Sequence, residues 1–424
     1  MKFPTVKIFL ISVLLTFLSA PVYAVPQASE VVQHYTELAH AVYEDSLITA
    51  HTLQKAVDKL ISEPTVANLR HARMAWLASR VPYMQSEVYR FGNAIVDDWE
   101  GKVNAWPLDE GLIDYVAASY GTESEENPAY RVNVIASPSF TFSGQSIDAS
   151  HITKDLLAST LHELGGIEAN VATGYHAIEF LLWGQDLNGV GPGNGNRPAT
   201  DFDPNNCSRG NCERRAAYLK MATDLLVDDL AWMVAQWVPG GEAREGLIQG
   251  GSKNGLSTIV TGMGSLSYGE LAGQRMQLGL LLHDPEEEHD CFSDNTHHSH
   301  YYDAMGIQNI YLGKYRRING SMVEGPGISA LVAAASPEVD KNLRDQLRTT
   351  MSAMEKLVHA AKNGEAYDQM IGEGNDSGNA RVQAAIDALT SQTRGIEQAA
   401  AVLQLASVEF EGSESLDNPE TVFE

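Results

Sequence analysis

The sequence has few positive charges for its length. Its 424 residues include 29 lysines and arginines against 55 aspartates and glutamates, a formal net charge of −26 at pH 7. Such a chain repels a phosphate backbone over most of its surface, which excludes nucleic-acid binding through overall charge. Hydrophobic residues make up 44% of the chain, enough for one large core or two ordinary ones, so we expect two domains at most.

Long apolar runs are also lacking. One near the N-terminus, residues 8–18, is too short to span a bilayer, which takes about 20 apolar residues, and no later run reaches that length. It follows Lys2 and Lys7 and precedes small residues that end at Ala24, which is typical of a secretory signal peptide. We expect residues 1–24 to be removed after export to the periplasm or cell envelope of a bacterium, leaving a chain with no transmembrane span.

Only three cysteines are present, so they cannot all pair within the chain. Cys207 and Cys212 lie in a turn-rich loop, and in an oxidising compartment we expect them to close a small disulfide ring. Cys291 is then left over in a polar segment rich in histidine. We expect it to be a small, half-buried residue rather than a reactive thiol or a metal ligand.

The alternation typical of β-strands is scarce, whereas helical spacing is frequent. An apolar stripe at spacings of three and four runs through residues 31–60, and another runs through residues 382–403. Between them, Ser336 followed by Pro337 is a favourable helix start. The fold class predicted from these patterns is all-α, with two helical-bundle domains.

Long loops and a faint internal repeat suggest how the domains divide. We expect an N-terminal helical domain over residues 25–238, a C-terminal helical domain over 239–411 and an acidic flexible tail over 412–424. Comparing the chain with itself at an offset of 99 residues aligns Gly174 with Gly273 and a few other identities. An ancient duplication and chance explain so few identities equally well.

The sharpest motif is the run GYHAIEFLLWG, residues 174–184. On a helix, His176, Glu179 and Trp183 share one face. An imidazole and a carboxylate are costly to bury in an apolar helix unless something pairs with them, and a metal ion would pair with both. The alternative is a His–Glu hydrogen bond that satisfies two buried polar groups without any ligand.

A polar stripe on the predicted helix 65–91 could complete such a site. At helical spacing, one face carries Arg73, Trp76, Arg80, Tyr83, Glu87 and Arg90. We predict that Glu87 is the third metal ligand, that Arg80 is its charge partner and that Tyr83 lines the pocket. Pro82 is expected to kink or break this helix. A solvated charged face would give the same spacing.

Histidines concentrate in residues 289–300, where four of them occur with two aspartates. This composition suggests metal affinity or a pH-sensitive hinge, although Ser, Asp and Asn residues in the same segment also suit a helix N-terminus. We expect Asp294, His297 and His298, together with Trp183, to line the pocket or support the ligands.

Common catalytic motifs are missing. His162 and Glu163 begin like the zinc-protease helix motif, but Gly166 stands where its second histidine is required. No strand-bordered nucleophile turn, P-loop or dinucleotide fingerprint is present.

The G-x-H-x-x-E core of residues 174–184 resembles the imelysin family, a group of bacterial envelope proteins connected with iron. Residues 80–92, 104–110 and 291–297 are also similar to that family, and the resemblance covers roughly residues 30–410. It implies a two-domain, all-helical fold descended from a duplicated bundle, with a metal or other functional site near the G-x-H-x-x-E helix. The residues it places in that site are His176 and Glu179, and with them Arg80, Glu87, Asp294 and His297.

The function we expect is that of an exported metal-binding protein serving iron uptake or homeostasis, with possible partners among envelope iron-uptake components. We expect one site per chain, because the repeat places Arg275 and Leu278 opposite the motif's histidine and glutamate. Iron is the expected metal, with zinc or copper as alternatives.

Two other functions stay open. The first is a metal-dependent peptidase, since the imelysin family was also classed as metallopeptidases. The second is an envelope adaptor that grips a protein or polysaccharide, in which aromatic side chains are stacking surfaces, namely Trp76, Tyr83, Trp106 and Trp183.

Overall fold

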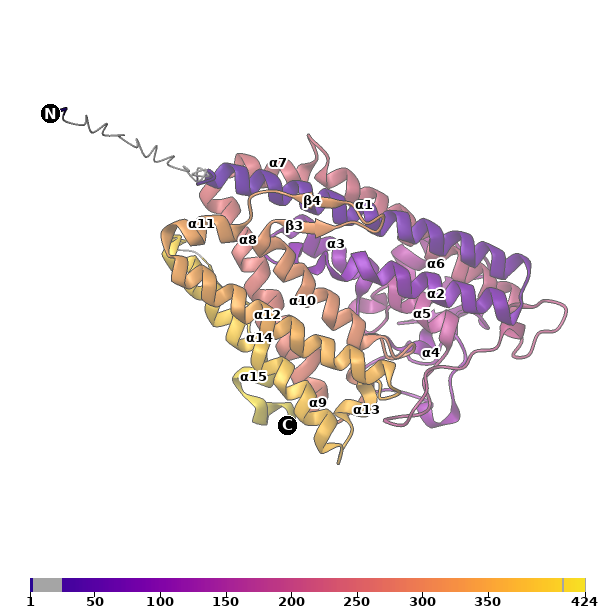
Figure 1. Cartoon of the computed structure of the whole chain (residues 1–424). Helices are drawn as coiled ribbons and strands as arrows, with labels where there is room; N and C mark the ends of the chain where they lie inside the picture. The colour runs from indigo at the N-terminus through magenta and orange to yellow at the C-terminus, as the bar shows by residue number, and fades with distance from the viewer. Residues whose placement is uncertain (3–24, 406–407, 424) are drawn as a thin grey trace.

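The computed structural model describes residues 1–2, 25–405 and 408–423 (Figure 1). The predicted signal-peptide cleavage site after Ala24 lies outside the described residues. No helix in the described part of the chain is long and apolar enough to cross a membrane.

The first half of the chain is a layer of long helices with irregular connections. Its helices are α1 (Ala28–Ser62), α2 (Val66–Met84), η1 (Glu87–Tyr89), α3 (Ala94–Asn104), α4 (Glu110–Ile113), η2 (Ala118–Tyr120), η3 (Leu156–Leu161), η4 (Leu164–Gly166), α5 (Gly174–Trp183), η5 (Ala199–Phe202) and α6 (Cys212–Trp237). Strands β1 (Ser139–Phe142) and β2 (Gln145–Asp148) form an antiparallel hairpin in this half. Helix α1 packs along both α2 and α6.

The second half forms a second group of helices, shown from pink to yellow in Figure 1. Its helices are α7 (Glu242–Gln249), α8 (Ser252–Ser265), η6 (Leu266–Gln277), α9 (Leu278–Leu282), η7 (Pro285–Glu287), α10 (Thr296–Leu312), α11 (Ile328–Ala335), α12 (Pro337–Lys362), α13 (Tyr367–Ile371), α14 (Asp376–Val402), α15 (Glu414–Asp417) and η8 (Pro419–Phe423). The antiparallel pair β3 (Lys314–Arg316) and β4 (Met322–Glu324) follows α10. Helices α12 and α14 run side by side.

The all-α prediction is confirmed, and the helices form where the apolar stripes predict them. Helix α1 buries its stripe from Val31 to Leu60. Helix α12 starts at Pro337, and the Ser336 hydroxyl accepts a hydrogen bond from the Val339 backbone N–H. The start of α12 follows the sequence signals for helix capping.

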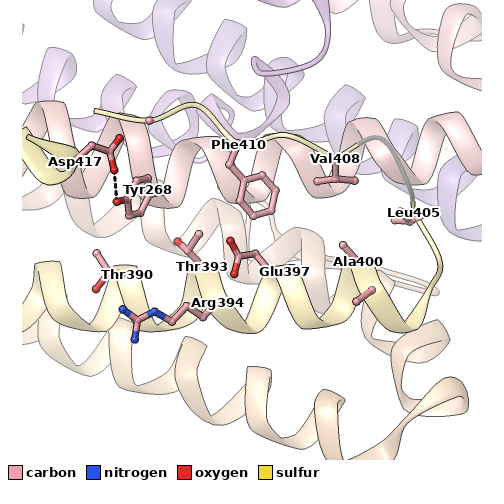
Figure 2. Close-up of a pocket in the computed structure, with 12 residues that line it drawn as sticks. Tyr268, Thr390, Thr393, Arg394, Glu397, Ala400, Leu405, Val408, Phe410 and Asp417 are labelled. Carbon is pink, nitrogen blue, oxygen red and sulfur yellow. Dashed lines mark hydrogen bonds between the residues drawn. The ribbon is translucent and has the colours of Figure 1, made fainter. Parts of the chain in front are cut away.

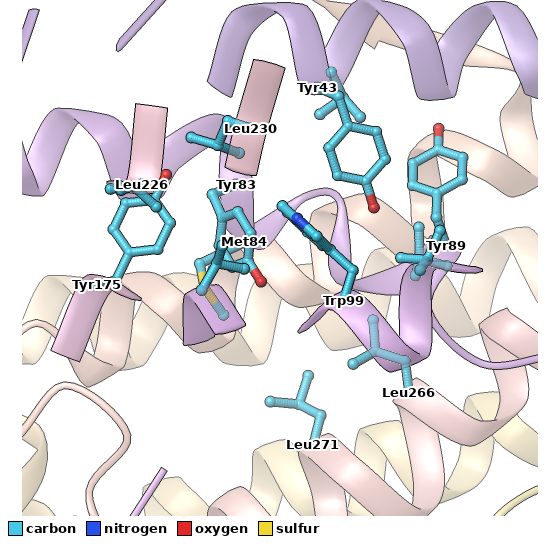
Figure 3. Packing of buried hydrophobic residues seen from close by; sticks show 14 of the residues in the cluster. Tyr43, Tyr83, Met84, Tyr89, Trp99, Tyr175, Leu226, Leu230, Leu266 and Leu271 are labelled. Carbon is cyan, nitrogen blue, oxygen red and sulfur yellow. The ribbon is translucent and has the colours of Figure 1, made fainter. Parts of the chain in front are cut away.

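One hydrophobic core joins the two halves. Figure 3 shows aromatic and aliphatic side chains from both halves meeting in it, including Tyr83 and Trp99 from the first and Leu266 and Leu271 from the second. Helix α10 contacts α2, and α8 contacts α1. The proposed boundary near residue 238 falls in the short connection between α6 and α7. Because the core is continuous across the two halves, a division into domains at this point leaves a large shared interface.

The predicted polar stripe on helix 65–91 is wrong beyond Tyr83. Helix α2 ends at Met84, two residues after Pro82, and a separate turn of 3₁₀ helix holds Glu87. Proline lacks a backbone N–H and its ring disturbs the preceding turn, so the helix ends here. Glu87 therefore does not continue the face that carries Arg80.

The predicted flexible tail also differs from the structure. Residues 408–417 lie across η6 and α14, where Phe410 packs over Gly264 and the Tyr268 hydroxyl donates to Asp417 at 2.7 Å (Figure 2). The Ser415 hydroxyl donates to the Gly273 carbonyl. Small residues on η6 leave room for this segment, which is why an acidic, loop-like sequence still docks.

Cys207 and Cys212 form a disulfide at the start of α6. Cys291 is a free and buried thiol, 7% exposed, rather than a half-buried one.

Candidate metal centre

Helix α5, which carries the G-x-H-x-x-E motif, is buried along its whole length. It begins at Gly174, whose φ of +77° places its backbone against that of Val103 in α3; an added Cβ would lie 2.4 Å from the Val103 carbonyl oxygen. Glycine is required here because any other residue would be strained at this positive φ, and its Cβ would clash with the Val103 backbone. The close approach to α3 puts the first turn of α5 in the core.

His176 and Glu179 point into this core and contact each other. Both are 0% exposed, and His176 Nδ1 lies 3.1 Å from Glu179 Oε2. Burial first, and then Arg80, lower the pKa of His176 well below its usual range, so the imidazole is neutral at pH 7. With its proton on Nδ1, it donates to Glu179 and keeps a lone pair on Nε2, which has no hydrogen-bond partner.

Both oxygens of Glu179 are occupied. Oε2 faces His176, and Oε1 accepts from the backbone N–H of Ser293 at 3.0 Å and from its hydroxyl at 2.6 Å. Burial and the nearby Asp290 carboxylate raise the pKa of Glu179. Glu179 is not in the group of described residues whose ligand atoms could hold an ion with His176, and its contact with Nδ1 suits a carboxylate that orients a metal-binding histidine.

Two residues of the histidine-rich segment 289–300, neither of them among the predicted site residues, meet His176. His176, His289 and Asp290 can each bring one ligand atom within 4.8 Å of the other two, and all three are buried. The His176 and His289 rings are 4.7 Å apart between centroids and nearly perpendicular. The sequence signal for these ligands was the adjacent pair His289-Asp290 in a histidine-rich segment. No local pattern, however, shows that this segment packs against α5.

Arg80 lies beside these groups without covering His176 Nε2. Its guanidinium donates to Asp290 Oδ1 at 2.8 Å and to Asn104 Oδ1 at 2.6 Å. Burial, the largest single effect, would raise the pKa of Asp290, but Arg80, His176 and hydrogen bonds from Ser299 and Asn295 together hold that pKa below its usual value. Asp290 is thus ionised, and its charge is shared with Arg80.

The predicted pairing of Arg80 with Glu87 is wrong. Glu87 Oε2 accepts a hydrogen bond from Arg275 at 2.8 Å, and Arg275 also pairs with Glu270 and Asp303. The end of α2 at Met84 places Glu87 in this separate ionic cluster. Among the described residues, Glu87 is outside the set that could hold an ion around His176.

The remaining predicted site residues occupy three different surroundings. Tyr83 and Trp183 are core residues: Tyr83 packs on Tyr175, and Trp183 packs on Trp76. His297 and His298 pack against each other in α10 with their rings tilted by 45°.

Asp294 faces away from the metal centre, toward other carboxylates. Burial and the charges of Asp368 and Asp186 raise the pKa of Asp294 to about 8.

A cleft of about 420 Å³ reaches the edge of the centre. Its lining includes His289, Asn104 and Trp106, together with several glutamates and Arg275. Trp106 is half-buried and packs on the His176 ring at 5.1 Å. His176 itself does not line the cleft, so Trp106 and His289 separate it from solvent.

The donor set fits a transition-metal ion. Two neutral imidazoles and one carboxylate are ordinary ligands of iron(II), zinc and copper, and the buried Nε2 without a partner is the atom that an ion would satisfy.

Comparison with known proteins places this chain in a family. A family model described as Imelysin (Peptidase M75) matches residues 39–396. Iron-regulated protein A of Synechococcus elongatus is 32% identical over 78 residues, which are 18% of this chain and only 22% of that relative. The crystal structure of a Parabacteroides distasonis chain assigned as an iron-regulated protein A precursor has a TM-score of 0.64 at 18% identity, covering 91% of this chain and 98% of that one, which shows a common fold. Because the family model spans most of the sequence, the chain belongs to the imelysin family.

Proposed function

We propose that this protein binds one transition-metal ion, iron(II) first, at His176, His289 and Asp290, and serves iron uptake or homeostasis outside the cytoplasm. The observation that carries the proposal is the buried, unpartnered Nε2 of His176 in a ring held by Glu179. Leaving such an atom without a partner costs free energy, which metal binding would recover. Similarity to iron-regulated protein A supports the choice of iron.

The surroundings are suited to holding an ion. Glu179 fixes the ring, while Arg80 and Asn104 fix Asp290 and the neighbouring His289. The acidic lining of the cleft, with Glu100, Glu163 and others, attracts cations to its mouth. An ion would then pass beside Trp106 to reach the two histidines.

Burial favours this binding role over the peptidase alternative. A metallopeptidase must bring a peptide carbonyl and a water molecule to the metal. His176 and Glu179 are 0% exposed, and the cleft ends at Trp106 and His289. The adaptor alternative loses three of its four stacking surfaces, because Trp76, Tyr83 and Trp183 are at most 3% exposed, and keeps only Trp106, which is half-buried at the cleft.

Metal titration tests the proposal. Purified protein, stripped with a chelator, is titrated with Fe²⁺ under anaerobic conditions and with Zn²⁺ as a redox-inert probe, using calorimetry and elemental analysis. We expect one ion per chain at this centre, and a loss of at least about 100-fold in affinity for His176→Ala and for His289→Ala.

An exposed histidine gives the matched control. His51 lies on the solvent side of α1, so His51→Ala should bind like the wild type. Wild-type affinity in His176→Ala would remove the proposal. Chelator-sensitive cleavage of unfolded casein, lost in Glu179→Gln, would instead support the peptidase alternative.

A further inference from the structure

The segment from Glu288 to Asp294 has a second face, turned away from the metal centre. His289, Asp290 and Ser293 contact the centre, whereas Glu288, Cys291 and Phe292 line a different pocket. That pocket holds about 10 Å³, room for one water molecule or one ion of similar size.

Carboxylates from four parts of the chain line this pocket. Its lining includes Glu110 of α4, Asp186 after α5, Glu286 and Glu288 around η7, and Asp368 of α13. The Asp294 carboxyl group lies near enough to interact electrostatically with Glu288 and with Asp368. Within the described residues, no lysine, arginine or histidine forms an ion pair with any of these six carboxylates.

Two of the most buried lining carboxylates have free oxygens. Glu288 is 0% exposed and its Oε1 has no hydrogen-bond partner; Asp368 is 2% exposed and neither of its oxygens has one. By contrast, Asp290 on the other face of the segment has partners for both oxygens. Buried carboxylate oxygens normally have a donor, so the missing partner points to a cation.

The raised pKa of a lining carboxyl group is also consistent with a cation site in this pocket. Burial, with the charge of Asp186 adding to it, raises the pKa of Asp368 to about 7. A cation would reverse this effect, because it stabilises the ionised form of every carboxylate around it.

We propose that this pocket is a second cation site, made of oxygen ligands from Glu288, Asp368 and neighbouring carboxylates, and that it takes a hard divalent ion, Ca²⁺ in preference to Mg²⁺ or a transition metal. It is chemically distinct from the two-histidine centre, and with it the chain would hold two ion sites instead of the one that the sequence analysis expects.

The geometry favours Ca²⁺ among the hard ions. In the described residues these oxygens do not form a set of three within 4.8 Å of one another, so an ion has to draw them together from loops and short helices. Ca²⁺ accepts 6–8 oxygens in flexible geometry, whereas Mg²⁺ demands near-ideal octahedral positions. Softer transition metals prefer the imidazoles of the other centre.

Calcium titration of the full chain, after chelator treatment, tests this proposal. We expect one Ca²⁺ per chain by calorimetry and a Tm rise of about 3 °C at about 100 times the Kd. Asp368→Asn and Glu288→Gln should each weaken Ca²⁺ binding at least about tenfold. They should melt no lower than the wild type without Ca²⁺, because they remove like charges while keeping the side-chain shape.

Two controls separate this site from the metal centre. His176→Ala should lose Zn²⁺ binding but keep Ca²⁺ binding, and Glu373→Gln, on the exposed surface after α13, should keep both. A wild-type chain that binds no Ca²⁺ at millimolar concentration, or an Asp368→Asn chain with wild-type affinity, would overturn the second site and leave the first intact.

Discussion

The hydrogen bond between His176 and Glu179 determines which imidazole nitrogen is left to bind a metal. It holds Nδ1 and so leaves Nε2, which has no hydrogen-bond partner, as the nitrogen available to an ion. Glu179 is itself fixed by two hydrogen bonds from Ser293. We therefore expect Glu179 to affect metal binding by orienting His176 and not as a ligand.

Glu179→Gln should lower Zn²⁺ affinity about 10–100-fold, because the neutral amide orients the ring less firmly and makes the imidazole a weaker donor to the metal. Calorimetric titration measures the change, with circular dichroism to verify the fold. Glu63→Gln, at the exposed end of α1, is the control. Unchanged affinity in Glu179→Gln would show that the carboxylate has no part in metal binding.

Asp290→Asn should be strongly destabilising even without metal. It leaves the buried Arg80 guanidinium without its charge partner, and breaking a buried pair in this way typically costs about 3–5 kcal/mol. Urea unfolding monitored by tryptophan fluorescence gives the free energy of unfolding. The exposed Lys59–Glu63 pair provides the comparison, and a loss no larger than that of Glu63→Gln would contradict the ionised state of Asp290.

Helix α5 depends on one glycine for its position. Gly174 combines a positive φ with contact against the Val103 backbone. Gly174→Ala should lower the free energy of unfolding by about 2–5 kcal/mol, since backbone strain and a steric clash add. Gly166 has a φ of +75° but nothing within 4 Å of an added Cβ, so Gly166→Ala should cost only about 1–2 kcal/mol. Equal losses in the two variants, compared by urea unfolding, would mean that the close approach of α5 to α3 is unimportant.

How well a contact could be predicted from the sequence depends on how far apart its residues lie along the chain. The spacing of His176 and Glu179 puts them within one helical turn, so their contact could be predicted. His289 and Asp290 reach the same place through the packing of a distant segment on α5, which no local pattern encodes. Pro82 predicted a break, but the direction that Glu87 takes after it depends on Arg275, from the other half of the chain.

On the scale of the whole molecule, the excess of acidic over basic residues extends into the interior. Asp294 and Asp368 hold pKa values of about 8 and about 7, raised first by burial. Their ordinary values are near 3.8. Around pH 7 the folded chain therefore keeps protons that the unfolded chain has already released.

The sign of the pH dependence follows from this difference. Where the folded state binds more protons, stability falls as the pH rises. Between pH 7 and pH 9, in the presence of a chelator, we expect the free energy of unfolding to drop by an amount on the order of 1 kcal/mol, as Asp294 and Asp368 lose their protons. Urea unfolding at several pH values measures it. The Asp294→Asn, Asp368→Asn double variant should show a flatter profile, and stability that rises over this range would contradict the raised pKa values.

The strip of backbone from Glu288 to Asp294 supplies side chains to both proposed ion sites, with His289, Asp290 and Ser293 on one side and Glu288, Cys291 and Phe292 on the other. Ordering that strip for one ion prearranges it for the other, and thermodynamic reciprocity makes the enhancement equal in both directions. If both proposed sites hold their ions, Ca²⁺ bound at one would tighten the binding of the transition-metal ion at the other, and removing Ca²⁺ would favour its release.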